Sequence, residues 1–150
     1  MKIKEGENAE ENKKYLVQVC QQILTAIFES RKHVPWEIAA ICKHLYLEVE
    51  KHYPGNGPKQ LGGFLFLRFF CPAVVQPAAN GVVQPDYFLS ENTKRGLILV
   101  TKVLQNLSNG IMFGAKEGYM GGILNDFISN NMAPLNDFFM SFVVFVFLFF

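Results

Sequence analysis

A lone arginine inside an apolar segment is the first residue of this sequence to suggest chemistry. The segment LGGFLFLRFFC runs from Leu61 to Cys71, and Arg68 is its one charged residue. A buried charge without partners costs several kcal/mol, so Arg68 is expected to reach carboxylates, carbonyl oxygens or an interface. It either braces nearby loops or serves a phosphate-transfer site, because its planar set of donors suits carbonyl groups and phosphate oxygens alike.

The other candidate groups lack the spacing of a known kind of site. His33, His44 and His52 are not spaced as metal ligands, and the sequence contains no G-x-S-x-G, H-E-x-x-H or P-loop motif. The pairs Gly62-Gly63 and Gly121-Gly122 could cradle a phosphate, but such pairs more often allow close helix packing or end a helix. We therefore expect no metal and no cofactor.

The composition limits the class of protein. A length of 150 residues corresponds to one domain or part of one. Half of the residues are apolar and 18% are charged, which argues against a disordered chain, and a net charge of +1 argues against a nucleic-acid binder. Three widely spaced cysteines favour a reducing compartment, so we expect a cytoplasmic protein.

The sequence predicts that all the elements that must position these residues are helices. Apolar residues at three- and four-residue steps predict helices over about 12–30 and 35–53. The Leu61–Cys71 segment could be a buried strand or helix, and we favour a central helix that Pro72 ends, because its neighbours are helical. Further helices are expected near 119–129 and from Pro134. The predicted fold class is all-α.

An amphipathic helix is predicted from Asn92 to Asn109, after an N-cap at Ser90 or Asn92 and before a stop at Gly110. One face is apolar. On the opposite face amides and a threonine outnumber acids and an isoleucine lies among them, which suits either a solvated surface or one that docks against a partner. This polar stripe comprises Lys94, Arg95, Ile98, Thr101, Lys102, Gln105 and Asn109.

Two segments resemble one known family. GFLFLRFFCPAVVQP (Gly63 to Pro77) is similar to the F-L-R-F-x-x-P-A signature of the Ras GTPase-activating proteins, and KRGLILVTKVLQNLSNGIMFGAKEGYM (Lys94 to Met120) resembles their downstream helix and F-G-A-K-E turn. The resemblance implies an all-helical domain of signal transduction that docks on a GTP-bound Ras-family GTPase. Such a domain hastens GTP hydrolysis by its partner and is not itself an enzyme.

The resemblance also implies roles for single residues. In the family an arginine finger enters the Ras site, and the arginine of the signature braces the finger loop; Arg68 occupies that bracing position. Leu67 resembles a residue that touches the Ras switch region. The partner-binding groove would be formed by Asn109 and Lys116, with Lys102 and Gln105 on the same predicted face. Where some family members carry a lysine, this chain has Ile98.

One family feature is missing from these 150 residues. The finger lies well upstream of the signature, and the arginines here are Arg31, Arg68 and Arg95, none of which falls in a finger loop. We expect the C-terminal part of the domain over 12–140, truncated at its N-terminal side, and little activation by the chain alone. The alternatives are a non-catalytic Ras-binding module and an inactive fragment.

Both ends of the chain depart from the family pattern. Residues 1–11 form a polar segment, and residues 141–150 form an apolar tail of uncertain origin. The apolar segment 138–150 is too short to span a bilayer, so we expect no transmembrane span. It could pack against a missing part of the domain, touch a membrane or result from a shortened gene model, and we favour the last. Recruitment to the inner face of the plasma membrane is a further expectation.

Overall fold

The predicted all-α fold class is confirmed. The computed structural model describes residues 9–145, apart from the side chains of residues 115, 116, 118 and 145, and every regular element in this part of the chain is helical. In chain order the elements are α1 (Ala9–Ser30), η1 (Arg31–His33), α2 (Trp36–His52), α3 (Gly57–Leu65), η2 (Phe66–Phe70), α4 (Cys71–Val75), α5 (Glu91–Asn109), η3 (Ala115–Met120) and α6 (Ile123–Phe145).

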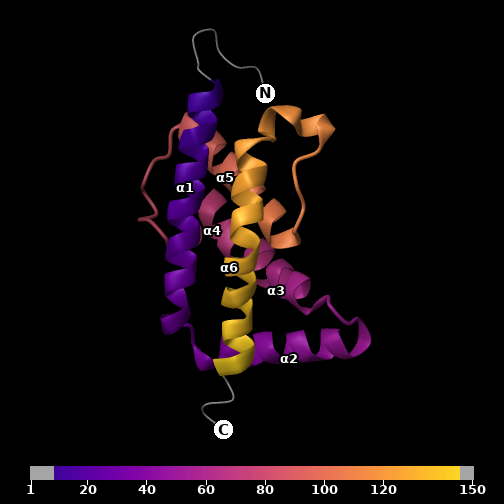
Figure 1. The fold of residues 1–150 in the computed structure, drawn as a ribbon. Helices are drawn as coiled ribbons and strands as arrows, with labels where there is room; N and C mark the ends of the chain where they lie inside the picture. Colours follow the sequence, from indigo (N-terminus) through magenta and orange to yellow (C-terminus); the bar gives the residue numbers. More distant parts are fainter. Residues whose placement is uncertain (1–8, 146–150) are drawn as a thin grey trace.

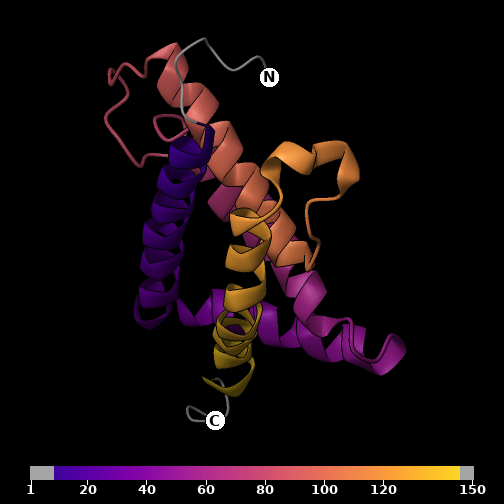
Figure 2. The ribbon, with the colours of Figure 1, turned by 45° about the horizontal axis from the view of Figure 1, so that its top comes forward.

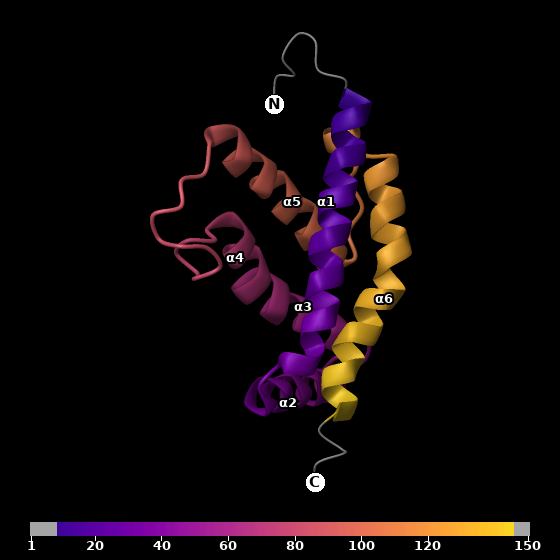
Figure 3. The same cartoon turned by 90° about the vertical axis from the view of Figure 1, so that its left-hand side faces the viewer.

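The helices form two layers above a transverse helix. Figure 1 shows α1 and α6 side by side, with α5 and the run from α3 to α4 behind them and α2 across the base. Figure 3 shows the two layers edge-on, and Figure 2 shows α5 crossing behind α1 and α6. Each helix has an apolar stripe to bury. The core therefore lies between the layers, where Leu24, Phe66, Leu104 and Ile128 are fully buried.

A carboxylate holds the tight turn between α2 and α3. Glu50 accepts the backbone N–H groups of Gly55 at 2.8 Å and Gly57 at 2.7 Å. The turn needs glycine at 55, where φ is +83°, a conformation that L side chains rarely adopt. These backbone hydrogen bonds lower the pKa of Glu50 below its ordinary value of 4.5.

This lowered pKa predicts an acid-sensitive turn. The ionised Glu50 carboxylate stabilises the folded state above its ordinary pKa of 4.5. This stabilisation is lost as the pH falls through the lower pKa that Glu50 has in the folded state. Thermal unfolding of the original chain and of Glu50→Gln should be compared between pH 3 and pH 7. At pH 7 the Tm of Glu50→Gln should be lower than that of the original chain, and at pH 3 this difference in Tm should be smaller. Glu37→Gln, at an exposed position of the same helix, is the control. An unchanged difference across this range would contradict the assignment.

The apolar segment is helical, as predicted, but Pro72 does not end it. The chain continues from α3 through the π-helical turn η2 into α4, which ends at Val75. In an α-helix the proline ring would collide with the carbonyl group four residues earlier. Here the N–H of Cys71 bonds to the carbonyl oxygen of Phe66, five residues earlier, and this wider turn accommodates the proline.

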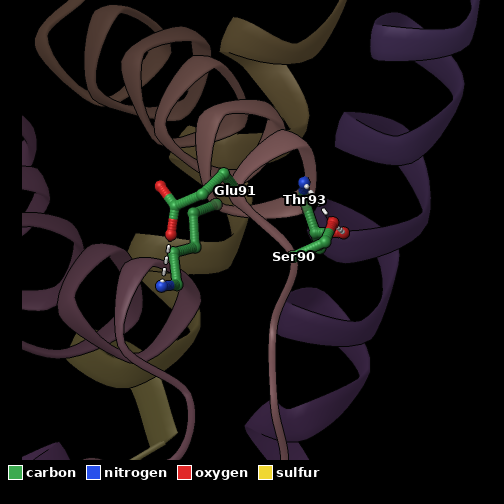
Figure 4. A network of polar contacts seen from close by, with 4 residues as sticks. Ser90, Glu91 and Thr93 are labelled. Carbon is green, nitrogen blue, oxygen red and sulfur yellow. Dashed lines mark hydrogen bonds and ion pairs between the residues drawn. The ribbon is translucent and has the colours of Figure 1, made fainter.

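The predicted boundaries of α5 are confirmed within one residue. Ser90 is the N-cap, and its Oγ accepts the N–H of Thr93 at 3.1 Å (Figure 4). An ion pair of 2.7 Å between Glu91 and Lys94 lies on the same turn. Gly110 ends the helix with φ of +66°. Local capping signals therefore determine both ends of the helix.

A single helix, α6, replaces the two that were predicted around Pro134. The predicted start at Pro134 is wrong: α6 runs from Ile123 to Phe145 with this proline inside it. Pro134 has no N–H group to donate to the carbonyl oxygen of Asn130. Both residues are exposed, so water can bond to that oxygen. Buried Asn131 and Leu135 hold the helix on either side.

The helix α6 extends into the apolar C-terminal segment. Phe138, Phe139 and Phe142 are buried, and the ring of Phe138 lies 5.4 Å from that of Phe28 on α1 and 4.9 Å from that of Phe142. One face of the segment from 138 to 143 therefore belongs to the core of this fold, while 146–150 lie outside the described residues. Among the described helices, none is both long and apolar enough to cross a membrane.

Candidate partner-binding site

One edge of α5 presents three of the predicted site residues. Lys102, Gln105 and Asn109 follow at three- and four-residue steps, which places them on one helical face, and all three are partly exposed. Thr101, which was predicted in the same polar stripe, is buried and donates its hydroxyl to the carbonyl oxygen of Leu97 at 2.8 Å. The stripe is therefore narrower than the sequence suggested.

The helix α5 is connected to the apolar segment at the end of η2. The helix packs against η2 and α4, and Gln105 lies close enough to Cys71, the residue directly after η2, to affect its pKa. Burial raises the pKa of the Cys71 thiol to about 11, with Gln105 acting in the opposite direction, so this cysteine is a neutral packing residue. Leu67, on the neighbouring turn, is 38% exposed. The α5 face thus lies next to the turn that carries Leu67 and Arg68.

Arg68 is exposed, contrary to the expectation from its apolar surroundings. Its neighbours Leu67 and Phe69 are exposed as well, because η2 buries only one side, with Phe66 at the centre of the core. Within residues 9–145, no hydrogen bond or ion pair involves the Arg68 guanidinium. Arg68 therefore braces no loop in the described part of the chain, and none of its five donors is used there.

A turn after α5 supplies a charge partner for Lys102. Glu117, within η3, forms an ion pair with Lys102, and this hydrogen bond raises the pKa of Lys102. The pair is about one-third exposed, so its contribution to stability is small, but it links η3 to the α5 face. The backbone of Lys116 belongs to the same turn, and its side chain lies outside the described residues.

A residue that sequence reasoning missed holds this turn from the other side. Asn125, near the start of α6, accepts the N–H of Phe113 at 2.8 Å and donates to the carbonyl oxygen of Phe113 at 3.2 Å. Nothing in the local sequence indicates this pairing, because the two residues meet only when α6 folds back on α5. Glu117 did have a signal, since it belongs to the F-G-A-K-E motif.

An apolar groove continues the α5 face toward the N-terminus of the helix. It has a volume of about 470 Å³ and is bordered by the turn after α4 and the first turns of α5. Ile98 is 54% exposed in this groove, and Lys94 lies 5.7 Å from the centre of the Phe88 ring. The arrangement combines an apolar surface with a cation, Lys94, at its edge, as protein-binding sites commonly do. Within the described residues, no group of histidine, cysteine or acidic side chains could hold a metal ion.

Comparison with known proteins identifies the family. The family profile described as "GTPase-activator protein for Ras-like GTPase" matches residues 2–109, which is more than half of the chain. The chain belongs to the RasGAP family. The predicted family membership is therefore confirmed.

Curated RasGAP relatives are much longer than this chain. Neurofibromin-A of Dictyostelium discoideum is 37% identical over 131 residues, covering 86% of the chain and 14% of the relative. The probable Ras GTPase-activating-like protein ngap of the same organism is 35% identical over 141 residues, covering 91% and 16%. Human Ras GTPase-activating protein 1 is 33% identical over 133 residues, covering 87% and 12%. The chain thus spans about one-seventh of the length of these relatives and part of a RasGAP domain.

Proposed function

We propose that this chain is the part of a RasGAP domain that docks on a Ras-family small GTPase in its GTP-bound form. The observation that carries the proposal is the face of α5 on which Lys102, Gln105 and Asn109 are partly exposed. The Lys102–Glu117 pair links this face to the second family motif, and α5 packs against η2, where Leu67 is exposed. Lys102 on this face and Lys116 in the turn after α5 would meet acidic groups of the partner and steer the encounter. No nucleic acid is expected as a partner.

Activation would require an arginine finger from outside these 150 residues. Phosphoryl transfer gains from an arginine that stabilises the charge developing on the transferred group, and the partner GTPase performs the hydrolysis. The guanidinium of Arg68, which is exposed and has no partner among the described residues, supports a role in bracing such a finger loop, because its donors are available to carbonyl groups of an incoming segment. The chain itself acts as a docking and bracing component, not as an enzyme.

A non-catalytic Ras-binding module is the second candidate. It is favoured by the positions of the other two arginines. Arg31 lies in η1, between α1 and α2, and Arg95 lies on the first turns of α5. Such a module would hold the GTP-bound form without hastening hydrolysis. Either function places the chain in the cytoplasm, and recruitment to the inner face of the plasma membrane would follow from a membrane-attached partner.

Binding that depends on the nucleotide tests the docking function. The chain should bind a Ras-family GTPase loaded with a non-hydrolysable GTP analogue and bind the GDP form much more weakly, as measured by calorimetry or biolayer interferometry. Lys116→Ala should weaken this binding by about tenfold, the loss of about 1.4 kcal/mol, because it removes a cation from the interface.

The control for this experiment is Lys51→Ala, an exposed lysine on α2 away from the α5 face. It should bind as the original chain does, and both variants should show unchanged circular dichroism. If Lys116→Ala binds normally, the assignment of this residue to the groove is wrong. If the original chain binds the GTP and GDP forms equally, the docking function itself is wrong.

A further inference from the structure

The turn that follows α5 is held at two described points on either side of Lys116. On one side, the Asn125 side chain makes both backbone hydrogen bonds of Phe113, at 2.8 Å and 3.2 Å. On the other side, Glu117 is paired with Lys102 on α5. Residues 114–116 therefore form a short bridge between a backbone fixed to α6 and a side chain fixed to α5.

The Asn125 contact is well suited to fixing a backbone. The amide of an asparagine side chain has an acceptor oxygen and a donor NH2 group in one plane, as a peptide group has an acceptor and a donor. Here they form hydrogen bonds with the N–H and the carbonyl oxygen of a single residue. Phe113 and Met120 are 5% and 3% exposed, so apolar burial secures the same turn at both ends. Leu124, beside Asn125, is fully buried, which fixes the first turn of α6 from which the amide extends.

We infer that Asn125 is a positioning residue of the partner-binding surface, acting through the turn that carries Lys116 and Glu117. The inference rests on the proposed docking function and adds to it a residue outside both family motifs. By holding the backbone of Phe113 against α6, Asn125 orders the turn before the partner arrives. The partner then need not order it, and binding gains from this preorganisation.

A double-mutant cycle tests the inference. Asn125→Leu keeps the branching and the number of heavy atoms of the side chain and removes both hydrogen bonds, so we expect binding to the GTP-loaded GTPase to weaken by about tenfold. In the Lys116→Ala background the same change should weaken binding by less than about twofold, because the cation that the turn positions is already absent. Asn125→Asp keeps the acceptor for the N–H of Phe113 and loses the donor. Its binding affinity should therefore lie between those of the original chain and Asn125→Leu.

Three further measurements make the test decisive. Asn130→Leu, at an exposed position of the same helix, should bind as the original chain does. Amide hydrogen exchange at Phe113 should accelerate in Asn125→Leu and remain slower in Asn125→Asp. If Asn125→Leu does not fold, the cycle made with Asn125→Asp decides alone.

The failure of the inference is distinct from the failure of the proposed function. Normal binding by the Asn125 variants, or equal losses with and without Lys116, would overturn the positioning role while leaving docking intact. Absence of nucleotide-dependent binding by the original chain would overturn the proposed function, and the positioning role with it.

Discussion

Added in excess to a GTP-loaded Ras-family GTPase, this chain is expected to leave single-turnover hydrolysis within a few-fold of the intrinsic rate. An arginine finger in such complexes is worth about 10³–10⁵ in rate, and our proposal places that finger outside these 150 residues. Docking through the α5 face positions the partner but adds no charge at the γ-phosphate. The expected result is therefore binding to the GTP form together with little acceleration.

The three arginines provide the matched variants for this measurement. Arg31→Ala and Arg95→Ala should leave the hydrolysis rate unchanged, since neither residue is proposed to approach the phosphate. Arg68→Ala should also leave it unchanged in this chain, because the loop that Arg68 would brace is not among the described residues. Acceleration by the original chain, abolished by one of these substitutions, would identify a finger and contradict the proposal.

Gly62→Ala is expected to destabilise the fold by about 2–4 kcal/mol, the second large effect. A Cβ atom at residue 62 would lie 2.5 Å from the backbone carbonyl oxygen of Ser108 on α5. That distance is far below van der Waals contact, and a backbone oxygen cannot rotate away as a side chain can. The helices α3 and α5 would have to separate, which would open the core around Leu61 and Leu104.

The neighbouring glycine supplies the control. Nothing lies within 4 Å of a Cβ built on Gly63, which is also inside α3. Gly63→Ala should therefore stabilise the fold by about 0.5–1 kcal/mol through helix propensity alone. Urea unfolding of the two variants would separate the effects by their sign. Equal stabilities would show that α3 and α5 do not approach as closely as described.

The paired glycines also show how much of the site the sequence could predict. Close helix packing was the favoured explanation for Gly62-Gly63, and the structure confirms it for Gly62 alone. The sequence could not distinguish the two residues, because only the position of α5 decides which one faces Ser108. The same reason explains Thr101, which the helical period placed near the polar stripe although α5 is buried on more than one side.

Prolines were the least reliable predictors of helix boundaries in this sequence. Pro35 and Pro54 mark real helix boundaries, whereas Pro72 and Pro134 lie within helical runs. A proline ends a helix when nothing offsets the lost hydrogen bond. Around Pro72 the π-helical turn makes room, and around Pro134 buried residues hold both halves of α6. These offsetting contacts come from other elements and leave no local signal.

The sequence by itself determined the all-α class, the ends of α5 and the family, because helical periodicity, capping residues and motif spacing are local properties of the chain. Tertiary structure alone decided the exposure of Arg68, the close approach of Gly62 to Ser108 and the meeting of Asn125 with Phe113. Each of these depends on the position of one helix relative to another. That position follows from the burial of every apolar face at once, and no single segment contains it.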